Sequence, residues 1–315
     1  MQSIQPSTSQ TLSSLGKSLT QDSSFTPYET RIHRDRPACV VFLVDQSGSM
    51  KNAWGSDSGK SKAEMVALYV NNAIHEIINI CQKTESEPRH YFDIAVIGYG
   101  KEADNAQLLW EGNLADKTFV SPAELKQNPT GNQGEIEVVR RTFKGEILVK
   151  IPVVYWFSPV AESLTPMGSA FDKCTELLKD WTVQHPNSFP PIVINITDGE
   201  QTDCKDHELL DKAYQLRQIQ TLYGKTLLFN VHISSSSEQS VVFPENANEI
   251  PSNKQSQLLY EMSSVLPMAF NQRIATEVKK TDLPENTTYV AMTFQASVSD
   301  MIKCLDIGTK TIKTS

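Results

Sequence analysis

Three short segments of the chain place small oxygen-bearing side chains close together. They are residues 45–49 (DQSGS), 165–168 (TPMG) and 197–200 (TDGE). Carboxylate and hydroxyl oxygens are the hard ligands that Mg²⁺ prefers in proteins. These segments could therefore form a cation site if the fold brings them together.

The strands and the helix expected next to these segments would bring the three segments close together. Residues 38–44 (ACVVFLV) and 191–197 (PIVINIT) are continuous apolar runs, typical of strands buried on both faces of a parallel sheet. The second segment directly precedes a helix predicted over 168–184. In open α/β sheets, ligands bind beyond the carboxyl ends of the strands, where the strand order reverses. We therefore expect one site that contains Asp45, Ser47, Ser49, Thr165 and Asp198.

A bound cation would explain why two acids occur in this set. Asp45 and Asp198 would repel each other if both were buried without a positive partner. The ligand types indicate Mg²⁺, with Mn²⁺ or Ca²⁺ as alternatives.

The remaining pattern alternates strands with helices. Strands are predicted at 91–98, 226–233 and 288–294. Helices are predicted at 61–82, 206–222, 255–280 with an interruption at Pro267, and 297–305. This alternation predicts an α/β fold, Rossmann-like and doubly wound, with a mainly parallel six-stranded sheet flanked by helices. Residues 135–157 alternate in polarity around Lys144-Gly145, which predicts a β-hairpin inside an insertion at about 100–160.

The ends of the chain differ from this pattern. Residues 1–36 are rich in Ser, Thr, Gln and Pro, which predicts a disordered polar tail. We expect one domain over 37–308 and a short tail over 309–315.

Composition argues against several classes of partner. The net charge is −8 and the pI is near 5.3, so neither nucleic acid nor an anionic membrane is an expected partner. No apolar run reaches the length of a membrane helix, and the first residues do not read as a secretory signal. The five scattered cysteines suit a reducing compartment. We therefore expect a cytoplasmic protein.

The motifs DQSGS, TPMG and TDGEQTD resemble the von Willebrand factor A domain with its metal-ion-dependent adhesion site. The resemblance covers roughly residues 38–305 and assigns all five predicted ligands. It implies that the two serines and Thr165 touch or closely hold the metal, and that the two aspartates bind largely through water. It also implies that a partner protein supplies an Asp or Glu to the metal.

A narrower resemblance rests on HPNSFPPIVINITDGEQTD, MSSVLP and CLDIGT. These stretches are similar to cytosolic bacterial A-domain proteins encoded beside a protein phosphatase and a kinase, as in the tellurium-resistance group. The implied function is metal-dependent protein binding in a signalling, stress or defence system, with a kinase or phosphatase among the expected partners.

An enzymatic alternative starts from the same aspartate. In a haloacid-dehalogenase-like phosphatase, Asp45 would be the nucleophile, and a second acid two residues later would protonate the leaving group. Residue 47 is a serine, so the expected protein is not an enzyme, and the Mg²⁺-dependent phosphatase is the alternative.

The aromatic run Tyr155-Trp156-Phe157 precedes Thr165 and allows two interpretations. The aromatics could pack against the sheet edge or the neighbouring hairpin. Alternatively, they could form a rim beside the metal that selects the partner.

Overall fold

The structure is a computed structural model of the chain. It describes residues 27–54, 59–82, 85–102, 104–131, 133–142, 145–234, 239–277 and 287–311.

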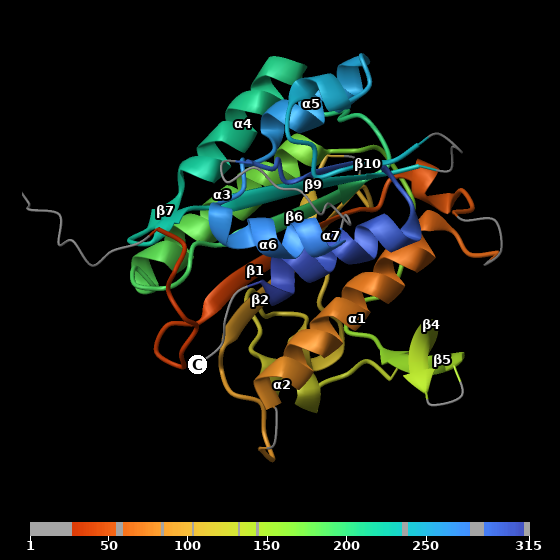
Figure 1. Cartoon of the computed structure of the whole chain (residues 1–315), viewed down its shortest axis with the longest axis vertical. Coiled ribbons are helices and arrows are strands. Elements are labelled where there is room, and N and C mark those ends of the chain that lie inside the picture. The colour runs from red at the N-terminus through yellow and green to blue at the C-terminus, as the bar shows by residue number, and fades with distance from the viewer. Residues whose placement is uncertain are drawn as a thin grey trace, which may run out of the picture.

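A seven-stranded sheet forms the centre of the molecule, in the order β10-β11-β9-β6-β1-β2-β3 (Figure 1). The five inner strands are parallel, and the two edge strands run antiparallel to their neighbours. The inner strands are β1 (Ala38–Asp45), β2 (Phe92–Tyr99), β6 (Ile192–Thr197), β9 (Leu227–Ile233) and β11 (Met292–Ala296), and the edges are β3 (Ala106–Leu108) and β10 (Val241–Val242). The predicted mainly parallel α/β sheet is confirmed. The prediction of six strands was wrong for this sheet: five of its seven strands were predicted by range, and the two short edge strands left no pattern.

Helices cover both faces of the sheet (Figure 1). One layer contains α1 (Lys62–Gln82), α6 (Met268–Glu277) and α7 (Val298–Lys310), and the other contains α3 (Met167–Gln184), α4 (Asp206–Gln218) and α5 (Lys254–Met262). A short helix, α2 (Pro122–Gln127), lies next to α1. None of the helices in the described residues is both long and apolar enough to cross a membrane.

The central strand β1 explains why both faces need a helical layer. Its alternate residues Val40 and Phe42 join the core beneath α1 and α7, whereas Val41 and Leu43 join the core beneath α3 and α4. All of β1 is buried. Burial on both faces is what the continuous apolar run predicted.

The strand order reverses at β1, which pairs with β2 on one side and with β6 on the other. Val44 lies beside Ile196 in the register of these parallel strands. Asp45 and the residues that follow Thr197 therefore leave the sheet side by side, at the topological switch point.

The insertion contains the predicted hairpin, formed by β4 (Gln133–Thr142) and β5 (Gly145–Val154). It stands beside α1 (Figure 1). Ile136 and Val153 of the hairpin pack against Leu68 of α1. The predicted turn at Lys144-Gly145 begins outside the described residues.

The domain extends beyond the predicted tail boundaries. Ile32 is fully buried, and the amide of Tyr28 donates a 2.8 Å hydrogen bond to the carbonyl of Tyr223. Residues 27–36 thus pack on the domain, because their few apolar side chains reach its core, while residues 1–26 lie outside the described part. At the other end α7 continues to Lys310, and residues 312–315 are outside the described part.

Two predicted elements are displaced. The last strand is Met292–Ala296 rather than 288–294, because backbone groups at Tyr289 and Ala291 bond to the loop after α5. Helix α4 ends at Gln218, because the next residues form a small hairpin of β7 (Gln220–Thr221) and β8 (Gly224–Lys225).

Candidate metal centre

Asp45, the last residue of β1, is fully buried. Its Oδ1 accepts a 2.8 Å hydrogen bond from the amide of Ser47, and its Oδ2 accepts one of 2.7 Å from the hydroxyl of Thr197. Burial raises the pKa of Asp45 to about 6; donors on Ser47 and Thr197 act to lower it, and the charge of Asp198 raises it further. A buried acid with only neutral donors is a group that a bound cation would stabilise.

A chain of hydroxyls connects this strand end to the next one. The hydroxyl oxygens of Ser47 and Ser49 are 3.1 Å apart. Ser49 then donates a 2.6 Å hydrogen bond to Oδ1 of Asp198. Four of the five predicted ligands are thus linked by hydrogen bonds, with the amide of Ser47 as the link to Asp45; we call these four residues the oxygen set.

Thr165 joins the set through the turn that carries Asp198. Its amide donates to the hydroxyl of Thr202 at 2.9 Å, and its carbonyl accepts from the amide of Thr202 at 3.0 Å. Its hydroxyl lies 3.8 Å from the point where a Cβ of Gly199 would stand. The Thr165 hydroxyl therefore faces the turn after β6.

Asp203 fixes the position of this turn against α3. Its carboxylate accepts hydrogen bonds from the amides of Gly168 at 3.2 Å and Ser169 at 2.8 Å. These amides belong to the first turn of the helix, where an anion is favoured. Any side chain at Gly168 would meet the carboxylate, since its Cβ would lie 3.0 Å from Oδ2 of Asp203. The motif TDGEQTD thus supplies a predicted ligand, Asp198, and also the carboxylate of Asp203, which holds the turn at Thr165 in place.

Gly100 allows the chain after β2 to pass close beneath the turn at Ser47. Its φ is +108°, and a Cβ there would lie 2.7 Å from the amide nitrogen of Ser47 and 2.6 Å from the carbonyl oxygen of Leu164. Gly100 also accepts a hydrogen bond from the amide of Ser163, and Ser163 in turn accepts one from Gly48. Three separate segments are therefore held together here by main-chain contacts.

Lys62, at the start of α1, is a site residue that the sequence did not indicate. Its ammonium donates a 2.8 Å hydrogen bond to Oδ2 of Asp198. Only 8% of the lysine side chain and 0% of the aspartate side chain are exposed. A lysine at the edge of an amphipathic helix normally faces solvent, so its type and position alone gave no signal.

A buried polar network beneath the site was also missed. The hydroxyl of Tyr99 donates to Asn195 at 2.8 Å, and Asn195 donates to Asn230 at 3.0 Å. These residues lie on β2, β6 and β9, across the strands that carry the site. Asparagine within the apolar runs of the two latter strands was the available signal, because a buried amide needs partners.

The residues present fit a hard divalent cation. The set combines two carboxylates with the hydroxyls of Ser47, Ser49 and Thr165, and all of these donors are oxygens. Within the described residues there is no group of three His, Cys, Asp or Glu side chains that could hold a metal. A cation held here would therefore need hydroxyl ligands in addition to the two carboxylates.

The aromatic run does not form the exposed rim that was proposed for it. Trp156 and Phe157 are 2% and 1% exposed and belong to the main core. The indole of Trp156 donates to the carbonyl of Leu125 at 2.7 Å. The partner-binding role assigned to these two residues is corrected, because their side chains fill the space between the insertion and α1. Tyr155 is half-buried, with its hydroxyl against Gly134 of the hairpin.

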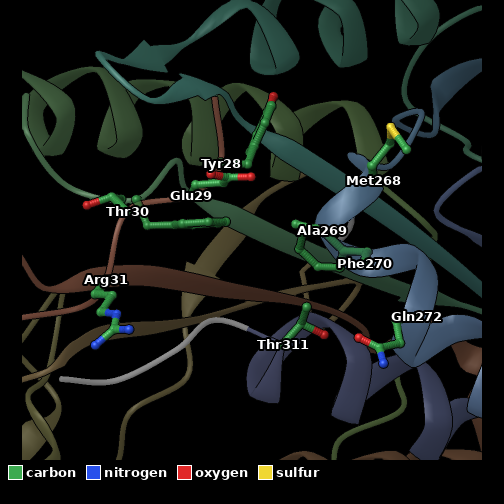
Figure 2. Close-up of a pocket in the computed structure, with 10 residues that line it drawn as sticks. Tyr28, Glu29, Thr30, Arg31, Met268, Ala269, Phe270, Gln272 and Thr311 are labelled. Carbon is green, nitrogen blue, oxygen red and sulfur yellow. The ribbon is translucent and has the colours of Figure 1, made fainter. Parts of the chain in front are cut away.

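A cavity of about 460 Å³ lies elsewhere, between the segment at Tyr28, the start of α6 and the end of α7 (Figure 2). Phe189, just before β6, contributes to its lining, so it lies at the amino edge of the sheet. Figure 2 shows Met268 and Thr311 on its border. None of the predicted ligands lines this cavity, so it is separate from the candidate metal centre.

No protein-family model matches the chain, and no curated protein matches it either. Among solved structures, it is similar to a von Willebrand factor type A protein from Catenulispora acidiphila, with 15% identity and a TM-score of 0.35 over 63% of this chain. The chain spans 34% of the length of that protein.

Two further solved structures show weaker likeness. The pilus adhesin RrgA from Streptococcus pneumoniae has 11% identity and a TM-score of 0.26, over 89% of this chain and 38% of the adhesin. A secreted C11 cysteine protease from Bacteroides thetaiotaomicron has 8% identity and a TM-score of 0.22, over 62% of this chain and 42% of the protease. At these scores the likenesses say nothing about the role of any residue.

Proposed function

We propose that this domain is a protein-binding module that captures a carboxylate of its partner through a divalent cation. The observation that carries the proposal is the hydrogen-bonded oxygen set that runs from Asp45 through Ser47 and Ser49 to Asp198. It lies at the switch point of the sheet, where α/β folds bind their ligands.

The cation would be held by the two aspartates and by the hydroxyls of Ser47, Ser49 and Thr165. When bound, it would supply a local positive charge on a chain of net charge −8. Mg²⁺ is the first choice because it accepts oxygen ligands and retains exchangeable water, with Mn²⁺ or Ca²⁺ as the alternatives. An Asp or Glu of the partner is the matching group.

The proposed partner is a protein kinase, a protein phosphatase or another component of a bacterial stress or defence system in the cytoplasm. This choice rests on the resemblance of the sequence to the tellurium-resistance group. The acidic composition supports neither nucleic acid nor an anionic membrane as the partner.

The geometry at Asp45 gives no support to the phosphatase alternative. A nucleophile has to contact its substrate directly, whereas Asp45 is fully buried with both oxygens engaged by Ser47 and Thr197, and would hold a small cation through water. Residue 47 carries a hydroxyl in place of the second acid. Binding rather than catalysis is therefore the function proposed.

Affinity capture from the native cell tests the proposal. The wild type should retain its partner in Mg²⁺ and release it in chelator, and Thr165→Ala should capture less because one ligand is lost while both carboxylates remain. A complex that withstands chelator and Thr165→Ala without loss would mean that the partner binds another surface.

A further inference from the structure

Without Asp198, the charged ammonium of Lys62 would be unfavourable at its position for two reasons. It is the first residue of α1, where the helix dipole disfavours a positive charge. Its side chain is also almost completely buried, which removes the water that would stabilise an ammonium group. A cation in such a position needs a specific anionic partner.

Asp198 is that partner, and it is also a predicted metal ligand. Its two oxygens have different contacts: Oδ1 accepts from the hydroxyl of Ser49, and Oδ2 accepts from the ammonium of Lys62. Among the ion pairs of the described residues, no other involves a predicted ligand. The lysine thus supplies positive charge at the same carboxylate that a metal would use.

The charges of the two aspartates and of Lys62 determine how the lysine affects metal binding. Asp45 and Asp198 interact unfavourably with each other, and the ammonium offsets part of that repulsion. A divalent cation at the same carboxylate would repel the ammonium. Each cation at Asp198 therefore weakens the hold of that carboxylate on the other cation.

We infer that Lys62 is a resident cation of this site and competes with the divalent metal for Asp198. The inference rests on the proposed function, because it takes the same oxygen set as a metal site. Lys62 stabilises the metal-free domain and lowers its affinity for metal. The site then exchanges an internal ammonium for an external cation, so that partner binding responds to the concentration of free metal.

Lys62→Met tests this exchange, because it keeps most of the apolar stem and removes the charge. Lys51→Met is the matched control, since Lys51 is exposed and precedes the same helix. Titration calorimetry at constant ionic strength should give a Mg²⁺ Kd about tenfold lower for Lys62→Met, against less than about twofold for Lys51→Met. In chelator, Lys62→Met should have a lower Tm than the wild type, and Asp198→Asn should remove that difference.

The possible results separate this inference from the proposed function. If the wild type binds Mg²⁺ and Lys62→Met binds it no more tightly, the competition is overturned while the metal site stands. If only Lys62→Met binds, the competition is supported and the proposed function of the unchanged chain is overturned. If neither binds, both are overturned.

The wild type offers a second measurement that does not depend on a folded variant. In chelator, lysine side-chain NMR should detect one ammonium group protected from solvent exchange by its hydrogen bond to Asp198. Addition of Mg²⁺ should abolish this protection. Protection that persists at saturating Mg²⁺ would overturn the competition.

Discussion

The hydroxyl of Ser49 donates a 2.6 Å hydrogen bond to Oδ1 of Asp198, across 149 residues of sequence. This contact joins the turn after β1 to the turn after β6. Because the two strands are neighbours in a parallel sheet, a polar residue after each of them is enough to form a shared site.

Gly100→Ala should destabilise the domain strongly. The new Cβ would collide with the carbonyl of Leu164 and the amide of Ser47, in a backbone conformation that side chains rarely adopt. We expect a loss of about 3 kcal/mol in the free energy of unfolding, measured in urea. Gly112→Ala is the control, because its φ is +61° with no atom near the added Cβ, and it should lose only about 1 kcal/mol. Equal losses would mean that close approach at Gly100 is unimportant.

Asp203→Asn should weaken metal binding although Asp203 is not a predicted ligand. Its carboxylate holds the amides of Gly168 and Ser169, and so fixes the turn at Thr165. We expect a loss of about 1 kcal/mol in stability, together with a higher Kd for Mg²⁺ in calorimetry. Asp180→Asn makes the same charge change at an exposed position near the other end of α3 and should leave the Kd unchanged. An unchanged Kd in Asp203→Asn would mean that Asp203 does not position the Thr165 turn for metal binding.

His90 should stabilise the domain in a defined pH range. Its Nε2 lies 2.6 Å from Oδ1 of Asp93, and this contact raises the pKa of His90 above 6.5. Burial acts to raise the pKa of Asp93, but the hydrogen bonds from His90 and Trp181 outweigh it and bring the pKa below 3.8. The contribution of His90 is therefore present below pH 6.5 and is lost as the pH rises through the raised pKa. The contribution of Asp93 is lost only as the pH falls through its lowered pKa.

Urea unfolding of His90→Gln at several pH values measures this effect. Because half of the histidine side chain is exposed, we expect a loss of no more than about 1 kcal/mol near pH 5.5, and almost none near pH 8.5. His207→Gln, at an exposed position on α4, is the control. A loss that is the same at both pH values would contradict the ion pair.

The hairpin should contribute to partner binding through Ile147 and Leu148, which are 48% and 69% exposed on β5. Replacing both with Asp should reduce partner capture while leaving Mg²⁺ binding and Tm unchanged, since neither side chain is in the core. Val183→Asp is the control, because Val183 is exposed at the far end of α3. If capture by the hairpin variant equals that of the wild type, the hairpin has only a structural role.

The inner strands were predictable because each is a continuous apolar run, as β1 shows. Such runs end where the chain meets solvent, so the polar residues after them also indicated the edge of the sheet. The short edge strand Val241–Val242 could not be predicted, because two residues have no periodicity. Its position depends on pairing with β11, which is a tertiary contact.

The difference between what a local sequence pattern indicates and what only a tertiary contact determines also applies to the site. That Asp45, Ser47, Ser49 and Asp198 lie close together was predictable, because Asp45 ends one buried strand and the other three follow closely after two neighbouring strands. Lys62 was missed because its partner is 136 residues away, and nothing local separates a buried lysine from a solvated one. The aromatic run was ambiguous for a related reason: only packing decides that Trp156 faces the core.

Titration of the metal-free wild type with Mg²⁺, beside Asp45→Asn, tests the central claim most directly. Calorimetry at neutral pH should show saturable binding of one Mg²⁺ by the wild type, and none by Asp45→Asn, because the amide removes a charge but retains the shape of the buried side chain. Matching circular dichroism spectra would show that the variant is folded. The absence of binding at millimolar Mg²⁺ in the wild type, or equal binding by Asp45→Asn, would contradict the proposed metal centre.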